Sequence, residues 1–184
     1  ERLKPKRFLH TLGVEQEALQ LARIHGIPLK EASTAALLHD CAKCLEAEDR
    51  DRLCKKYDVE LTDFEKENPF LIHAKLGAAL AKHKYGVEDE EILSSIIYHT
   101  TGKPDMTMLE KIIFSADFIE PNRKMLLCLP KIRSVIFEDI DRAVYLILKQ
   151  TIIHLGNKKM AVDEHSQEAL RYYERFAKEE DLDL

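Results

Sequence analysis

Glycine and proline are scarce in this chain, with 6 of each among 184 residues, and no segment alternates apolar with polar residues as a half-buried β-strand does. This excludes a fold of many short strands and turns and favours long helices. No apolar run approaches the roughly 20 residues that a membrane-spanning helix needs. A positive excess is also lacking, since 28 Lys and Arg stand against 33 Asp and Glu, for a net charge of -5. We therefore expect no membrane and no nucleic-acid partner, although local Lys and Arg residues can still hold a small phosphate-bearing molecule.

Cysteine is present at four positions, 41, 44, 54 and 128. Cys41 and Cys44 form a CxxC pair, but no second pair of ligands follows at a similar spacing, so a structural zinc site is not expected. In a long helical chain such thiols are typical of a reducing compartment, and the charged residues 1–6 do not resemble a signal sequence. We expect a cytoplasmic protein with reduced cysteines.

Helical periodicity runs through the whole chain, and residues 1–184 suffice for one domain but not for two. A capping-box pattern, Thr107 with Glu110 three positions on, opens one of the helices. The predicted helices are residues 7–25, 30–43, 46–56, 69–85, 88–99, 107–117 and 139–155, followed by an amphipathic helix through Leu170, Tyr173 and Phe176. We predict an all-α, single-domain helical bundle whose final helix packs on its own core rather than on a second subunit.

The adjacent residues His39 and Asp40 close an apolar helical stretch, residues 35–38. An imidazole nitrogen beside a carboxylate oxygen suits a divalent metal of intermediate hardness, such as iron, manganese or zinc. Further donors for such a site, contributed by other helices, are His10, His73, His99 and Asp117. This set favours a metal-dependent enzyme.

Taken singly, these side chains also have structural explanations. His10 on an amphipathic helix would commonly be a partly buried histidine, and His99 would cap the carbonyls of its helix. Asp117 would be a helix-terminal carboxylate or a partner of Arg123, yet the end of a helix disfavours a negative charge, which is evidence for a function. The histidines not expected in the site are His25, His83, His154 and His165.

Four short segments around the candidate ligands resemble the HD superfamily of metal-dependent phosphohydrolases. The order of a lone histidine, a His-Asp pair and a later aspartate is met by His10, His39-Asp40 and Asp117. The segments RFLHTLGV (7–14), LHDCAK (38–43), IHAKLGA (72–78) and ADFIEPNR (116–123) are similar to the YqeK branch, which cleaves diadenosine tetraphosphate symmetrically into two ADP. The resemblance covers residues 7–123, whereas residues 130–180 share only a helical character.

The resemblance implies a centre for one or two metal ions. The ligands that it implies are His10, His39, Asp40, His73, His99 and Asp117. Asp40, with oxygens directed both ways, would bridge the two ions, and His73 and His99 would belong to the second. Neutral imidazoles with two carboxylates favour iron or manganese over magnesium, which prefers oxygen ligands. We expect iron, with manganese as a substitute.

Cationic residues near these ligands are the expected substrate contacts. Arg7 precedes His10 by three positions, and Lys43 follows Asp40 by three, so both would face the same pocket. The catalytic residues we expect are Asp40, Lys43 and Arg7, and the nucleotide contacts are Arg7, Lys43, Thr101, Gly102, Glu120 and Arg123. The alternative for each cation is a solvated surface charge.

The metal ligands alone do not choose the substrate. A nucleotidase, a phosphodiesterase and a non-catalytic nucleotide sensor would all use the same side chains. The flanking segments favour a dinucleoside polyphosphate, with ADP or GDP as the bound product. Either a monomer or a homodimer is compatible with the sequence.

Overall fold

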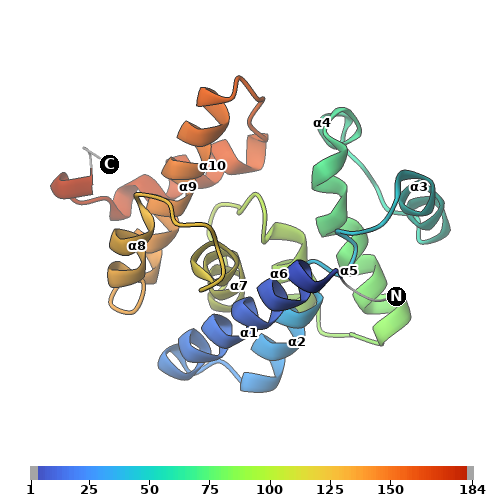
Figure 1. The fold of residues 1–184 in the computed structure, drawn as a ribbon, viewed down its shortest axis with the longest axis horizontal. Helices are drawn as coiled ribbons and strands as arrows, with labels where there is room; N and C mark the ends of the chain where they lie inside the picture. Colours follow the sequence, from blue (N-terminus) through green and yellow to red (C-terminus); the bar gives the residue numbers. More distant parts are fainter. Residues whose placement is uncertain (1–3, 182–184) are drawn as a thin grey trace.

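The computed structural model describes residues 4–181 and contains helices and loops without a β-strand in that part of the chain (Figure 1). Residues 1–3, in the charged N-terminal segment, and residues 182–184, at the end of the acidic tail, lie outside the described residues. The predicted all-α class is confirmed. None of the helices within residues 4–181 is long and apolar enough to cross a membrane.

The α-helices of the described residues are α1 (Pro5–His25), α2 (Leu29–Leu38), α3 (Ala47–Lys56), α4 (Asp63–Glu67), α5 (Ile72–Tyr85), α6 (Glu90–Tyr98), α7 (Met108–Ile119), α8 (Leu129–Val135), α9 (Ile140–Asn157) and α10 (Glu164–Tyr173). Short 3-10 helices are η1 (Pro69–Leu71), η2 (Glu174–Phe176) and η3 (Glu179–Asp181).

Helix α7 lies at the centre of the arrangement. It packs against α1, α6 and α9, and α2 packs against both α1 and α6. Helix α5 packs on α6 and contacts α3, whereas α9 carries α8 and α10. Figure 1 shows the result, with α3–α5 on one side of α7 and α8–α10 on the other. Residues from both flanks therefore approach the same central helices.

Local signals account for several of the helix ends. Helices α1 and α5 end at Gly26 and Gly86, whose φ angles of 71° and 70° lie in the left-handed region that glycine adopts without strain. At the start of α7, Thr107 Oγ1 accepts from the Glu110 N–H at 3.3 Å, and Glu110 Oε2 accepts from the Thr107 N–H at 2.7 Å. The predicted capping box is confirmed.

The helix predicted for residues 30–43 is too long, because α2 ends at Leu38 and residues 39–44 form turns. The Ala36 carbonyl accepts from Nδ1 of His39 at 2.6 Å, which competes with continuation of the helical ladder. The next bonds span three residues instead of four, from the Cys41 N–H to the Leu38 carbonyl at 3.1 Å. The turns place His39 and Asp40 together at the end of α2.

Two helices of the structure, α4 and α8, were not predicted from the helical periodicity of the sequence. Helix α4 opens with a capping box between Thr62 and Glu65, the same pattern that was recognised at Thr107, but it is too short to show a period. Helix α8 begins at Leu129, between the helices predicted for residues 107–117 and 139–155. Pro130 is tolerated there because it stands in the first turn, a position that needs no N–H.

The C-terminal helices are tied into the core. Tyr173 of α10 is fully buried, and its hydroxyl accepts from the Met106 N–H at 3.0 Å, so the predicted packing of the last helix on its own domain is confirmed. Further along, Nε of Arg142 in α9 donates to Oδ2 of the buried Asp181 at 2.7 Å. This ion pair anchors η3 to α9.

Candidate metal centre and nucleotide cleft

Three histidines share one local arrangement, His39 and His99 directly after the ends of α2 and α6 and His73 in the first turn of α5. Nδ1–H donates to the carbonyl three residues earlier in His39 (Ala36, 2.6 Å), His73 (Phe70, 2.6 Å) and His99 (Ile96, 2.7 Å). A carbonyl only accepts, so Nδ1 carries the proton and the lone pair lies on Nε2. All three Nε2 atoms face a common centre, the orientation that a metal ligand requires.

The first donor set contains four residues. Nε2 of His10, in α1, lies 3.1 Å from Oδ1 of Asp117, in the last turn of α7, and 3.6 Å from Oδ2 of Asp40. Nε2 of His39 lies 3.5 Å from the same Asp40 oxygen and 3.9 Å from Asp117 Oδ1. Two ligands about 2.1 Å from one ion are at most about 4.2 Å apart. His10, His39 and Asp117 offer atoms close enough to one another to hold one divalent metal, and Asp40 Oδ2 lies beside both histidines.

The second donor set uses the other oxygen of Asp40. Asp40 Oδ1 lies 3.2 Å from Nε2 of His73 and 3.5 Å from Nε2 of His99. The two histidine nitrogens are 3.2 Å apart. Oδ2 therefore faces the first set and Oδ1 the second, which is the geometry of a bridging carboxylate.

Unpartnered polar atoms support a metal at this centre. Within the described residues, His10 Nε2, His39 Nε2 and Asp40 Oδ1 are buried and have no hydrogen-bond partner. A buried polar atom without a partner costs about 1–3 kcal/mol or more, and coordination to a cation would offset that cost. The donor set and its geometry thus fit a divalent ion on either side of Asp40.

The pKa values of the centre follow from burial and the mutual contacts of its members. Burial opposes ionisation of Asp40, but the close approach of His10 and the other three histidines holds its pKa well below the usual range. Burial likewise disfavours protonated His10, yet Asp117 and Asp40 raise its pKa to about 9. Burial lowers the pKa of His73 to about 4, which keeps this imidazole neutral and able to bind a metal.

Arg7 and Lys43 both line the basic cavity beside the centre, the shared pocket that their spacing predicted. Arg7 Nη1 donates to Asp40 Oδ2. Lys43 Nζ lies 3.7 Å from Asp40 Oδ1 and 2.9 Å from His73 Nε2, and burial lowers the pKa of its ammonium. The structure brings both cations to Asp40, although neither was distinguishable from a surface charge by sequence.

Two cavities, each of about 650 Å³, open on the centre. The basic cavity reaches His10 and Asp40, and its cationic residues are Lys4, Lys6, Arg7, Lys43, Arg123 and Lys124. The apolar cavity reaches His99, and its apolar walls include Phe114, Phe118, Leu126, Leu127, Ile147 and Leu155. Asp117, Arg123 and Lys124 line both cavities, so the two meet beside the donor sets.

The structure corrects two expected nucleotide contacts. The Gly102 N–H donates to the Tyr98 carbonyl at 2.8 Å and closes the end of α6, so this amide is not free for a phosphate. Thr101 Oγ1 donates to the Gly102 carbonyl at 3.0 Å, and Thr101 lines neither cavity. The neighbouring Thr100 does line the apolar cavity, with Oγ1 3.1 Å from Nε2 of His99.

Arg123 and Glu120 both line the basic cavity, but Arg123 is half-buried and Glu120 is buried. Arg123 lines both cavities, and its Nη2 donates to the Asp117 carbonyl at 2.7 Å. Glu120 is only 2% exposed, and Oε1 lies 3.2 Å from Nδ1 of His10, behind the metal-facing nitrogen. Sequence reasoning also missed Gln150, Thr151 and His154, which line the apolar cavity from α9, because no nearby ligand marked them.

A helical domain with this histidine–aspartate centre, set between a basic and an apolar cavity, is the architecture of a metal-dependent phosphohydrolase. The HD domain family matches residues 7–122, more than half of the chain, and the protein belongs to this family. This confirms the predicted HD-type fold.

Comparison with known proteins extends the similarity beyond the HD core. The chain is 38% identical over 164 residues to a Bacillus subtilis protein named symmetrical bis(5'-nucleosyl)-tetraphosphatase, covering 88% of this chain and 86% of that protein. A Staphylococcus aureus protein of the same name is 34% identical over 177 residues, covering 94% and 89%. A crystal structure of a predicted HD superfamily hydrolase involved in NAD metabolism, from Clostridium acetobutylicum, superposes with a TM-score of 0.89 at 36% identity, covering 95% and 92%.

Proposed function

We propose that this protein is a metal-dependent hydrolase that cleaves diadenosine tetraphosphate, and related dinucleoside polyphosphates, symmetrically into two nucleoside diphosphates. The observation that carries the proposal is the position of Asp40, whose two oxygens face separate donor sets beside the junction of the two cavities. The names of the relatives, which match nearly the whole chain, support the same reaction.

The metal ligands in this proposal are the six residues of the two donor sets, His10, His39, Asp40, His73, His99 and Asp117. Mixed imidazole and carboxylate donors favour iron, with manganese as a substitute, over magnesium. When bound, such an ion supplies Lewis-acid stabilisation of phosphate charge and lowers the pKa of a water molecule at the site.

The cationic side chains of the basic cavity hold the polyphosphate. Arg7 and Lys43 stand beside the two oxygens of Asp40, where each can donate charge-assisted hydrogen bonds to a phosphate. Arg123 lies at the junction of the cavities, and its hydrogen bond to the Asp117 carbonyl fixes its direction. Fixed cations that neutralise a phosphate near the reacting phosphorus favour attack and stabilise the leaving diphosphate.

The regiochemistry follows from where the centre lies. A substrate with a nucleoside at each end of its phosphate chain can extend into both cavities when its middle lies over the donor sets. Attack at the central anhydride then releases two equal halves, each with one nucleoside and two phosphates.

The decisive test is product analysis with the protein loaded anaerobically with ferrous iron. Diadenosine tetraphosphate should yield ADP alone by ion-exchange chromatography, and Asp40→Asn should yield nothing. AMP with ATP would overturn the symmetrical cleavage. A protein that binds metal but forms no product would favour another nucleotide substrate or a nucleotide sensor over the proposed function.

A further inference from the structure

The walls of the apolar cavity come from two different parts of the chain. His99, Thr100, Phe114, Asp117 and Phe118 belong to the part matched by the HD family, which ends at residue 122. The remaining wall comes from residues 123–128 and from α9. The C-terminal helices thus complete a cavity that the HD core leaves open on one side, and they add no metal ligand to it.

The part contributed by α9 has a distinct chemical character. Gln150, Thr151 and His154 line the cavity among apolar side chains, and Gln150 and Thr151 are half-buried. Residues 150 and 154 are four apart, so they share one helix face. A cavity of this size with apolar walls and a few polar groups is typical of a small-molecule site.

A purine base fits these groups better than a phosphate does. Its flat faces are apolar, and its edge presents donors and acceptors. The Gln150 side chain offers both an amide donor and a carbonyl acceptor, the combination that pairs with an adenine edge. The cations of the cavity, Arg123 and Lys124, are the residues that it shares with the basic cavity, so phosphate is favoured at the junction.

We propose that the apolar cavity binds one purine nucleoside of the substrate and that Gln150 hydrogen-bonds the edge of its base, with Thr151 beside it. The inference rests on the proposed function, because it places one half of the same substrate. It assigns the α9 wall to base recognition and the HD core to phosphate chemistry. The specificity of this chain for a purine would then lie outside the segments that carry the metal ligands.

The test compares two ligands that differ by the nucleoside. ADP and pyrophosphate are titrated calorimetrically into the metal-loaded parent and into Gln150→Leu, with Gln16→Leu as the matched control, since Gln16 is exposed on α1 and lines neither cavity. Gln150→Leu should weaken ADP about tenfold or more and leave pyrophosphate unchanged. Gln16→Leu should bind both ligands like the parent.

Unchanged ADP affinity in Gln150→Leu, or an equal loss for both ligands, would overturn the inference. Should that variant fail to fold, Thr151→Val gives the same comparison with a nearly isosteric change. The parent's turnover of diadenosine tetraphosphate is scored separately. If ADP binding depends on Gln150 but the parent does not turn over diadenosine tetraphosphate, the nucleoside site stands and the proposed function is rejected. If the parent turns over diadenosine tetraphosphate but ADP binding does not depend on Gln150, the proposed function stands and the nucleoside site is rejected.

Discussion

Nδ1 of His10 lies 3.2 Å from Oε1 of Glu120, a residue 110 positions further along the chain. The other carboxylate oxygen, Oε2, accepts from the Asn122 N–H at 2.6 Å, so the carboxylate is held in place. This contact sets the direction of the imidazole and leaves Nε2 facing Asp40 and Asp117. Glu120 lines the basic cavity, where a nucleotide contact was expected, and it also lies behind a candidate metal ligand.

Removal of this carboxylate should weaken metal binding without removing a ligand. We expect Glu120→Ala to lower metal affinity about 10- to 100-fold, because His10 loses the partner that orients it. Titration of ferrous iron or manganese measures the change. Glu88→Ala, which alters an exposed glutamate, should bind metal like the parent. Equal affinities in the parent and Glu120→Ala would show that the contact does not orient His10.

Gly13 gives a second way to disturb the same contact. A Cβ atom added to this residue of α1 would lie 2.6 Å from Oε2 of Glu120, so we expect Gly13→Ala to displace the carboxylate and to lower metal affinity about tenfold. Gly156→Ala is the control, because a Cβ there meets nothing within 4 Å and should stabilise α9 by about 0.5–1 kcal/mol. Metal titration and thermal unfolding measure both effects. A Gly13→Ala protein with parental metal affinity contradicts the prediction.

The second donor set can be tested by metal stoichiometry. His73→Ala removes an imidazole that contacts Asp40 Oδ1 but leaves the first set complete, so bound metal should fall by about one ion per chain. His83→Ala, on the same helix, is the matched control, because His83 stacks on Tyr57 at 4.9 Å and is not among the donors. Elemental analysis of the purified proteins gives the ratios. An unchanged ratio in His73→Ala would refute a second ion held by this histidine.

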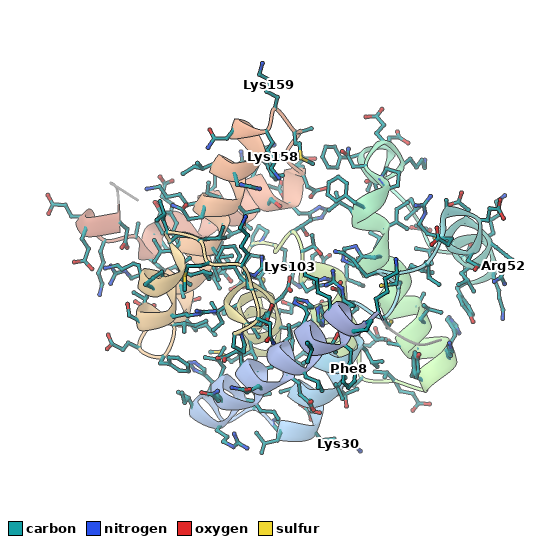
Figure 2. The ribbon with its side chains drawn as sticks, in the orientation of Figure 1. Phe8, Lys30, Arg52, Lys103, Lys158 and Lys159 are labelled. Atoms are coloured by element: carbon teal, nitrogen blue, oxygen red, sulfur yellow. The ribbon has the colours of Figure 1, made fainter. Side chains whose placement is uncertain are left out.

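Substitution of Arg7 should weaken substrate binding without changing metal binding. We expect Arg7→Ala to raise KM about tenfold or more at unchanged metal content, because its guanidinium lines the basic cavity and is not a metal ligand. Lys30→Ala removes a cation at the edge of the molecule, where Lys30 extends outward (Figure 2), and should leave KM unchanged. Loss of metal in Arg7→Ala would mean that Arg7 supports Asp40 structurally.

The anchor of the C-terminal segment should give a pH-dependent stability. Hydrogen bonds from Arg142 hold the pKa of Asp181 below its usual value, so the stabilisation is fully present above the unfolded pKa of about 3.9 and is lost as the pH falls through the folded pKa. We expect Asp181→Asn to lower the free energy of unfolding by about 3 kcal/mol at pH 7. Urea unfolding at pH 7 and near pH 3 measures the difference, which should shrink at the lower pH. An equal difference at both pH values would contradict the ion pair's role.

Much of the fold was predictable because the signals for it are local. A helix is set by its apolar period and by caps within a few residues of each end, as at Thr107 and Gly86. The errors were local as well. The end of α2 depends on a hydrogen bond from the His39 side chain, and α4 is shorter than any period that could be recognised.

The sequence by itself determined the helical class and the chemistry of the metal centre, because donor atoms are intrinsic to residue types and periodicity is intrinsic to a segment. Only the tertiary structure decided which oxygen of Asp40 faces which donors, that Glu120 supports His10, and that α9 completes the apolar cavity. Those relationships join residues tens to more than a hundred positions apart. They depend on how helices pack, and packing is a property of the folded chain rather than of any one segment.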